Sequence, residues 1–145
     1  MKYSLSLLTL SLLLFCSLSA CKKGNVAPSI ETANDTIAAQ VNGAPMIFYS
    51  IRFSAYTAGA YSEFNIIGGD NTRTISLHIA NYHGVGTYLF TGSNSSASFQ
   101  DSTTTYAATS GSVIITKTTN SYIQGIFSFT AGPYNITNGL FNSTL

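Results

Sequence analysis

The stretch of sequence that decides the fold is Thr74-Ile75-Ser76-Leu77-His78-Ile79-Ala80. Its apolar residues recur at every second position, so Ile75, Leu77 and Ile79 lie on one face of an extended strand and the polar residues on the other. Strands with one apolar face are typical of antiparallel sheets that cover a core on one side. The stretch therefore predicts a strand of such a sheet.

The same alternation recurs on both sides of this stretch. Residues 46–54 and 122–130 repeat the period of two, and nothing from Thr36 onward sustains the helical period of 3.6. We expect each of these segments to form one strand. The core-facing residues would be Ile47, Tyr49, Ile51 and Phe53 in the first segment, and Ile123, Phe127 and Phe129 in the second.

Turn signals separate the expected strands. Asn42-Gly43 and Asn138-Gly139 are dipeptides that favour type I′ hairpin turns, and Gly68-Gly69-Asp70-Asn71 is a further turn signal. A turn about every 8 to 12 residues is typical of sandwiches and barrels. We therefore expect an all-β domain, an antiparallel two-sheet β-sandwich of meander-like order with roughly 8–10 strands. A closed β-barrel is the alternative that the sequence leaves open.

Residues 92–110 break this rhythm because serine and threonine dominate them. We interpret them as a long loop that Phe99 and Tyr106 hold to the core through short strands. A loop of this length is either functional or a plain connection, and the plain connection is the preferred interpretation.

The composition excludes one class of partner. The chain has six Lys and Arg against five Asp and Glu, and only 8% of its residues are charged. Such a surface has no positive field to gather phosphates, so we do not expect it to bind nucleic acid.

The amino-terminal segment predicts export. Lys2 precedes an apolar run over residues 5–15, which is shorter than the roughly 20 residues that a membrane-spanning helix needs. Leu18-Ser19-Ala20-Cys21 resembles the bacterial lipobox, in which the cysteine is lipidated and the chain is cut before it. An ordinary secretory signal cut after Ala20 is the alternative.

These motifs divide the chain into three parts. We expect residues 1–20 to be a lipoprotein signal peptide, 21–35 a lipidated tether that begins at Cys21, and 36–145 the all-β domain. The protein would then be a lipid-anchored protein of the cell envelope, at the outer membrane. The membrane itself would be its partner, through the lipid anchor. Lys22 and Lys23, where some bacteria place acidic export signals, leave the membrane face undecided.

A series of short motifs also resembles a known family. They are Val41-Asn42-Gly43, Gly86-Thr87-Tyr88-Leu89-Phe90, Gly111-Ser112-Val113-Ile114-Ile115, Gly125-Ile126-Phe127-Ser128-Phe129 and Thr137-Asn138-Gly139-Leu140-Phe141. In this order they resemble an uncharacterised family of small all-β Bacteroidota-type lipoproteins of unknown function. Members often carry a Trp soon after the first Asn-Gly, and this chain has none. The resemblance implies an exported all-β lipoprotein and no known activity.

Catalytic and metal-binding residue types are sparse. His78 and His83 are the only histidines, and we expect both to be solvated rather than to bind a metal or cofactor. A hydrolase would have to combine His83 with Glu63 or Asp70 in a shared cleft. We therefore do not expect an enzyme.

Tyrosines are the stronger candidates for binding. Tyr56, Tyr61 and Tyr82 lie near predicted turns, where exposed rings would stack on the faces of sugars. The preferred alternative is that such rings cap the ends of the core. Thr36 and Ser102 lie in short Asp-Thr and Asp-Ser motifs that resemble bacterial O-glycosylation sites, and we expect both to be exposed.

The resulting hypothesis is a membrane-anchored, non-catalytic lipoprotein that serves as a binding or structural module of the bacterial envelope. Its partner would be an envelope protein or a glycan. The alternatives are a glycan-binding accessory lipoprotein that uses exposed tyrosines and, less favoured, a hydrolase.

Overall fold

The computed structural model describes residues 35–58, 61–92 and 94–145 of the chain. Regular structure in these ranges consists of ten β-strands, and no helix there has the length and apolar character that crossing a membrane requires. The strands are β1 (Thr36–Val41), β2 (Ala44–Phe48), β3 (Ser50–Ala58), β4 (Tyr61–Gly69), β5 (Arg73–Ile79), β6 (Gly86–Leu89), β7 (Ser95–Asp101), β8 (Thr104–Thr119), β9 (Tyr122–Ala131) and β10 (Tyr134–Thr144).

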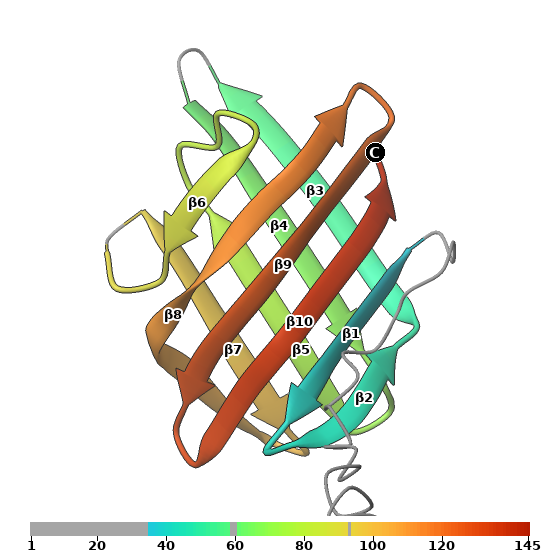
Figure 1. Cartoon of the computed structure of the whole chain (residues 1–145), viewed down its shortest axis with the longest axis vertical. Coiled ribbons are helices and arrows are strands. Elements are labelled where there is room, and N and C mark those ends of the chain that lie inside the picture. Colours follow the sequence, from blue (N-terminus) through green and yellow to red (C-terminus); the bar gives the residue numbers. More distant parts are fainter. Residues whose placement is uncertain (1–34, 59–60, 93) are drawn as a thin grey trace, which may run out of the picture.

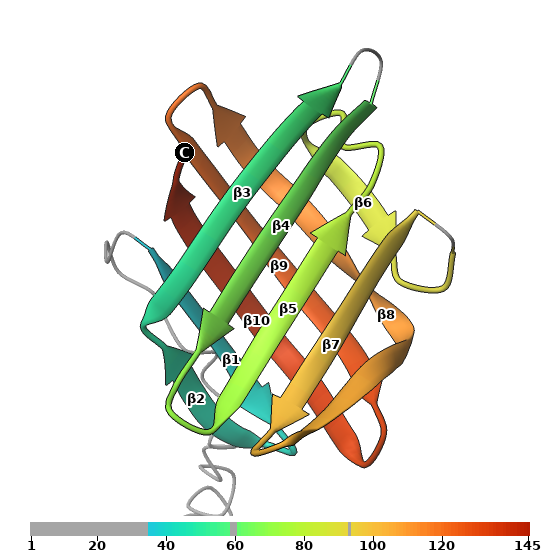
Figure 2. The ribbon, with the colours of Figure 1, turned by 180° about the vertical axis from the view of Figure 1, so that it is seen from behind.

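The strands form one curled antiparallel sheet in the order β2-β1-β10-β9-β8-β7-β5-β4-β3, with β6 paired to β8. Most neighbours are consecutive in the chain, which confirms the meander-like order. The sheet folds into two layers whose strands cross, with β1, β10, β9 and β6 in the front layer and β3, β4, β5 and β7 in the back layer (Figures 1 and 2). The all-β antiparallel prediction is confirmed, and the curled sheet is compatible with both a sandwich and a barrel.

One corner between the layers is made by β8. The first part of this 16-residue strand pairs with β7, and the later part pairs with β6 and β9. The register shifts between Ala108 and Ser110, and Gly111 follows with a φ of 127°. A Cβ atom at Gly111 would collide with the backbone of Ser128 and Phe129. Only glycine therefore fits the place where the strand passes between layers.

The second corner is Tyr49, which joins β2 to β3. These two strands are the two ends of the sheet order, so the chain itself links the first strand of the sheet to the last. The prediction of a single strand over residues 46–54 is therefore wrong. The expected core face is wrong for Ile47 and Tyr49, which are 48% and 75% exposed, whereas Phe48 between them is fully buried. The side chains of Ile51 and Phe53 lie outside the described part of the structure.

The core lies between the two layers. The predicted inward faces of the strands at 74–80 and 122–130 are confirmed, because Ile75, Leu77, Ile79, Ile123, Phe127 and Phe129 are all buried. Full burial of one such side chain contributes roughly 1.5–3 kcal/mol to folding. The largest fully buried residues are Phe48, Phe64, Phe99 and Phe141.

The two Asn-Gly dipeptides differ in their structures. Asn42 and Gly43 have φ angles of 50° and 82° and form the predicted turn between β1 and β2. The turn predicted at Asn138-Gly139 is wrong, because β10 continues through both residues. Asn138 has a φ of 49° and lies at a register shift between Ile136 and Gly139, so this dipeptide forms a bulge.

The long loop predicted over residues 92–110 is also mostly strand. β7 and the start of β8 form a hairpin whose turn contains Ser102. Ala97 and Phe99 are buried, whereas Ser96 before them is exposed and Ser98 between them is half-buried. Apart from the buried Ser95, most of the hydroxyl residues of these strands thus lie on the outward face.

Candidate functional site

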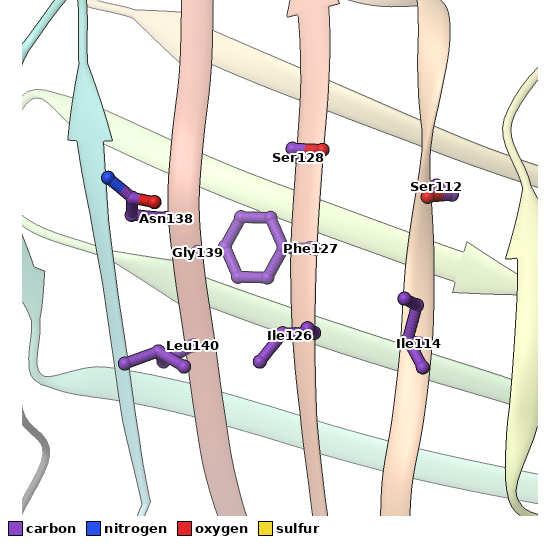
Figure 3. A pocket seen from close by; sticks show the side chains of 8 residues that line it. All are labelled: Ser112, Ile114, Ile126, Phe127, Ser128, Asn138, Gly139 and Leu140. Carbon is purple, nitrogen blue, oxygen red and sulfur yellow. The ribbon is translucent and has the colours of Figure 1, made fainter. Parts of the chain in front are cut away.

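A row of apolar side chains crosses the outer face of the front layer. Ile114 of β8 pairs with Ile126 of β9, and Ile126 pairs with Leu140 of β10. Leu140 pairs in turn with Ala38 of β1, and Ala38 with Ile47 of β2, but Ala38 itself is buried at 1% exposure. Residues paired across antiparallel strands lie on the same face. Figure 3 shows the first three of these side chains at one level across neighbouring strands.

A shallow hollow of about 280 Å³ lies along this row. Beside the row, Ser112 pairs with Ser128, and Asn138 lies at the bulge of β10. Gly139 pairs with Phe127 and has no side chain, so the Phe127 ring lies directly beside it (Figure 3). The hollow is lined by Ser112, Ile114, Ile126, Phe127, Ser128, Asn138, Gly139 and Leu140.

The lining of this hollow is uncharged, since it contains only aliphatic, aromatic, hydroxyl and amide groups. The Asn138 side-chain amide donates a hydrogen bond to Oε1 of Gln40 at 3.0 Å. One row away, the buried Oδ1 of Asn142 has no hydrogen-bond partner. Such a surface has nothing to attract an ion, and its chemistry suits contact with another uncharged surface.

A second hollow of about 210 Å³ lies on the outer face of the back layer. His78 lies there, with its Nε2 3.9 Å from Oε2 of Glu63. Both side chains are more than a third exposed, so an ion pair between them would contribute little. The lining residues are Asn65, Ile67, Ser76, Leu77, His78, Ser96, Ala97, Ser98 and Ala107.

The structure separates His83 from Asp70, one of its two candidate catalytic partners. Nδ1 of His83 lies 3.0 Å from the carbonyl oxygen of Asn81. Asp70 precedes the other end of β5 and forms an ion pair with Arg73 at 3.2 Å. A strand of the length of β5 spans on the order of 20 Å. The other candidate, Glu63, has its histidine contact with His78 instead.

Asp70 stabilises the turn between β4 and β5 by accepting hydrogen bonds from its backbone. Desolvation acts to raise its pKa, but hydrogen bonds from the backbone N–H groups of Thr72 and Arg73 outweigh this effect, and the pKa is lowered. The carboxylate is thus held ionised by the turn that it caps.

Tyr82 packs against the core rather than standing exposed. Its ring is half-buried and stacks on Phe64 at a centroid distance of 5.1 Å, and its hydroxyl donates a hydrogen bond to Thr118 at 2.9 Å. This position matches the end-cap interpretation. Tyr56 pairs with Glu63 and Tyr61 with Ala58 in the β3–β4 hairpin, but the side chains of both tyrosines lie outside the described part of the structure.

A second aromatic cluster closes the opposite end of the core. The Tyr134 ring packs on Phe99 and Tyr106 at centroid distances of 4.7 Å and 5.3 Å. Its hydroxyl donates a hydrogen bond to Asp101, and this bond, together with desolvation, raises the pKa of Tyr134. Tyrosine therefore caps both ends of the molecule.

The two expected glycosylation sites differ in access. Ser102 is exposed at the tip of the β7–β8 hairpin. Thr36 is the first residue of β1 and is only 5% exposed, so its expected exposure is wrong. The lipidation candidate Cys21 lies outside the described residues.

Across the ranges that are described, no three His, Cys, Asp or Glu residues are grouped as a metal site would require.

Sequence reasoning missed the apolar row of the front layer. Ile114, Ile126 and Leu140 are apolar residues at outward positions of their strands, which is a signal that the sequence does carry. Their alignment, however, depends on the register of three strands and cannot be read from one segment.

The fold and its surfaces define a small, all-antiparallel β domain whose outer sheet faces carry its hollows. The chain belongs to the family described as a domain of unknown function, DUF6252, whose model matches residues 34–144. No curated protein matches the chain. No solved structure matches it either.

Proposed function

We propose that this protein is a lipid-anchored, non-catalytic binding or structural module of the bacterial envelope, held at the outer membrane. The lipobox-like Leu18-Ser19-Ala20-Cys21 supports the anchor. β1 begins at Thr36, so only about 15 residues separate the proposed anchor from the domain. As a flexible coil, such a tether reaches on the order of 20 Å, which keeps the domain near the bilayer.

The observation that carries the binding half of the proposal is the apolar row with its uncharged hollow. Isolated apolar residues on a surface are common, but contiguous ones mark interaction sites. Ile126 keeps 40% of its surface exposed, and Ile47, on the far side of the buried Ala38, keeps 48%. A partner surface that covers them would gain the free energy of their burial.

The positions of Asp70 and His83 argue against a hydrolase that uses this pair. Asp70 is engaged by Arg73 and by backbone N–H groups, and His83 contacts a backbone carbonyl. A general acid–base pair needs the two groups within hydrogen-bond reach of one substrate. Asp70 and His83 lie at opposite ends of β5, which does not meet this requirement.

Metabolic palmitate labelling tests the anchor. Wild type and Cys16→Ser are expected to incorporate label and to fractionate with the outer membrane. Cys21→Ser is expected to lose the label. Because Cys16 lies only five residues before Cys21, Cys16→Ser is a close control for disturbance of the signal segment. Equal labelling of Cys21→Ser and wild type would overturn the proposal.

A glycan-binding accessory lipoprotein is the second candidate. The hollow of the back layer favours it, because amide, hydroxyl and imidazole groups of Asn65, Ser96 and His78 line it. Tyr56 belongs to the strand next to Asn65, where it pairs with Glu63. Binding on a glycan array that is lost in Tyr56→Ala and Tyr61→Ala would support this candidate. An array without binding would remove it.

A further inference from the structure

We propose that the free edge of β3 is a docking site for a segment of this same chain, residues 29–33, which would pair with it as a further antiparallel strand. These five residues, Ser-Ile-Glu-Thr-Ala, precede β1 and lie outside the described residues. The inference goes beyond the proposed function, because it concerns how the amino-terminal segment meets the domain and does not require lipidation of Cys21.

One edge of β3 has no partner strand within the described part of the chain. β3 ends the sheet order, and among the described strands it pairs with β4 alone. Its nine residues contain no proline and pair with β4 without a register shift, so no bulge turns this edge away from a partner. The unpaired N–H and C=O groups of such an edge are a template for one more strand.

β2, at the other end of the sheet order, is a poorer template. It has five residues, and the second of them is Pro45, which has no N–H to donate. The segment before β1 also runs away from β2. Ile37 pairs with Phe48, the last residue of β2, so the residues before Ile37 continue past the end of that strand.

The segment before β1 joins the domain beside the start of β3. Because β1 and β2 are antiparallel, the direction that leads backward from Ile37 is the one that the chain takes from Phe48 into β3. The starts of β1 and β3 lie side by side (Figures 1 and 2). Gly68 pairs with Ile51 of β3, and a Cβ atom at Gly68 would lie 2.6 Å from the side chain of Ile37.

Asp35 provides a change of direction where one is needed. The chain turns a corner at Tyr49 between β2 and β3, so a strand that follows both must turn at the same level. Asp35 has a φ of 60°, in the left-handed region, and its carboxylate is held by the backbone N–H of Thr144. A turn at Asp35 therefore matches the one at Tyr49.

The charges favour residues 29–33 as the occupant. Arg52 is exposed in β3, and no carboxylate of the described ranges forms an ion pair with it. Glu31 is the one acidic residue among residues 22–34. Opposite charges on paired residues of neighbouring strands stabilise the pairing.

The register that joins these charges also suits the apolar residue of the segment. With Glu31 opposite Arg52, Ile30 lies opposite Phe53, which pairs on its other side with the buried Ile66. Paired residues share a face of the sheet, so Ile30 takes a position on the core side and Glu31 one on the outer side.

Docking shortens the link between the domain and the proposed anchor. Residues 22–28 alone then separate Cys21 from ordered structure. As a flexible coil, seven residues reach on the order of 15 Å. Pro28 directly precedes the docked segment, where the missing N–H costs no ladder bond.

Hydrogen exchange of the full chain, measured by mass spectrometry, tests the docked strand. Ile30→Pro with Glu31→Pro removes two consecutive backbone donors, one of which must face β3. We expect the amides of residues 50–54 to exchange at least about tenfold faster in this variant than in wild type. Gly24→Pro with Asn25→Pro lies outside the docked segment, is the matched control and should exchange as wild type does.

The same measurement contains its own checks. Unchanged protection of β9 in both variants shows that they fold. Equal exchange of residues 50–54 in the two folded variants would overturn the inference. Protection of these residues that rises with protein concentration would also overturn it, because the added strand would then come from a second copy.

Charge reversal gives the second arm. Glu31→Arg and Arg52→Glu are each expected to speed the exchange of residues 50–54 about two- to fivefold, and the two together to restore it, because the pair forms again with reversed signs. Single reversals without effect, or a double variant without recovery, would contradict the inference. Palmitate labelling reports on the anchor alone, so failure of either proposal leaves the other testable.

Discussion

Asp35 and Thr144 join the start of the first strand to the end of the last. The Asp35 carboxylate accepts a hydrogen bond from the backbone N–H of Thr144 at 2.9 Å. It also accepts one from the Ser143 hydroxyl at 2.9 Å. These bonds, with that of the Thr144 backbone the strongest, lower the pKa of Asp35 below its ordinary value. The ionised carboxylate therefore stabilises the closure of β1 on β10.

This carboxylate makes the stability depend on pH. Because the pKa of Asp35 is lowered in the folded state, its contribution is complete above the unfolded value of 3.8 and is lost as the pH falls through the folded value. We expect Asp35→Asn to lower the free energy of unfolding by about 1 kcal/mol at pH 7. Urea unfolding at pH 7 and below pH 3 measures this, and the difference from wild type should shrink at the lower pH. A difference of equal size at both would contradict the prediction.

Gly125 makes room for a core ring. A Cβ atom at this position would collide with the ring of Phe141 and with the carbonyl oxygen of Ile114. We expect Gly125→Ala to lower the free energy of unfolding by about 2 kcal/mol, since the packed core must shift to admit a methyl group. Gly86→Ala is the control, because its Cβ would have no neighbour closer than 3.9 Å. Similar losses in the two variants, measured by urea unfolding, would argue against this packing.

Gly111 is required by the corner in β8. Its φ of 127° is unfavourable for any side chain, and the added Cβ would meet the backbone of Ser128 and Phe129. Backbone strain and collision together predict that Gly111→Ala loses about 3 kcal/mol of unfolding free energy. Gly92→Ala, where the nearest atom would be 4.0 Å away, should stay near wild type. A thermal unfolding midpoint unchanged in Gly111→Ala would show that the corner tolerates a side chain.

Tyr82 is a structural residue in this fold. Tyr82→Phe keeps the stacking on Phe64 and loses the hydrogen bond to Thr118, so we expect a cost of about 1 kcal/mol. Tyr82→Ala removes the half-buried ring as well and should cost about 2 kcal/mol. Chemical unfolding of both variants separates the two contributions. Loss of glycan binding in Tyr82→Ala would therefore count against a structural role only if the unfolding curve shows that this variant is folded under the conditions of the binding assay.

Local alternation predicted the strands whose pattern is regular. β5 and β9 follow the expected inward faces because each pairs on both sides and packs on the core through one face. The turn at Asn42-Gly43 followed from its own backbone preference. These elements needed no information from distant parts of the chain.

The elements that sequence reasoning missed depend on distant partners. Asn138 has the positive φ that a hairpin turn requires, but a bulge requires it too, and pairing with β9 decides between them. Tyr49 interrupts a run that looks like one strand because β2 and β3 pair in different layers. The apolar row likewise exists only through the registers of β8, β9 and β10. Nothing within a single strand distinguishes these cases.

The pairing of β1 with β10 has a consequence for the order in which the domain assembles. Thr36 pairs with Asn142, so one side of the first strand stays open until the end of the chain arrives. A contact between positions so far apart carries a large loop-closure cost and forms slowly. If the chain becomes available for folding from its amino end, the edge of β1 that later pairs with β10 therefore stays unpaired until β10 is available. Once β10 has paired with β1, the hydrogen bond from the Thr144 backbone N–H to the Asp35 carboxylate stabilises this pairing.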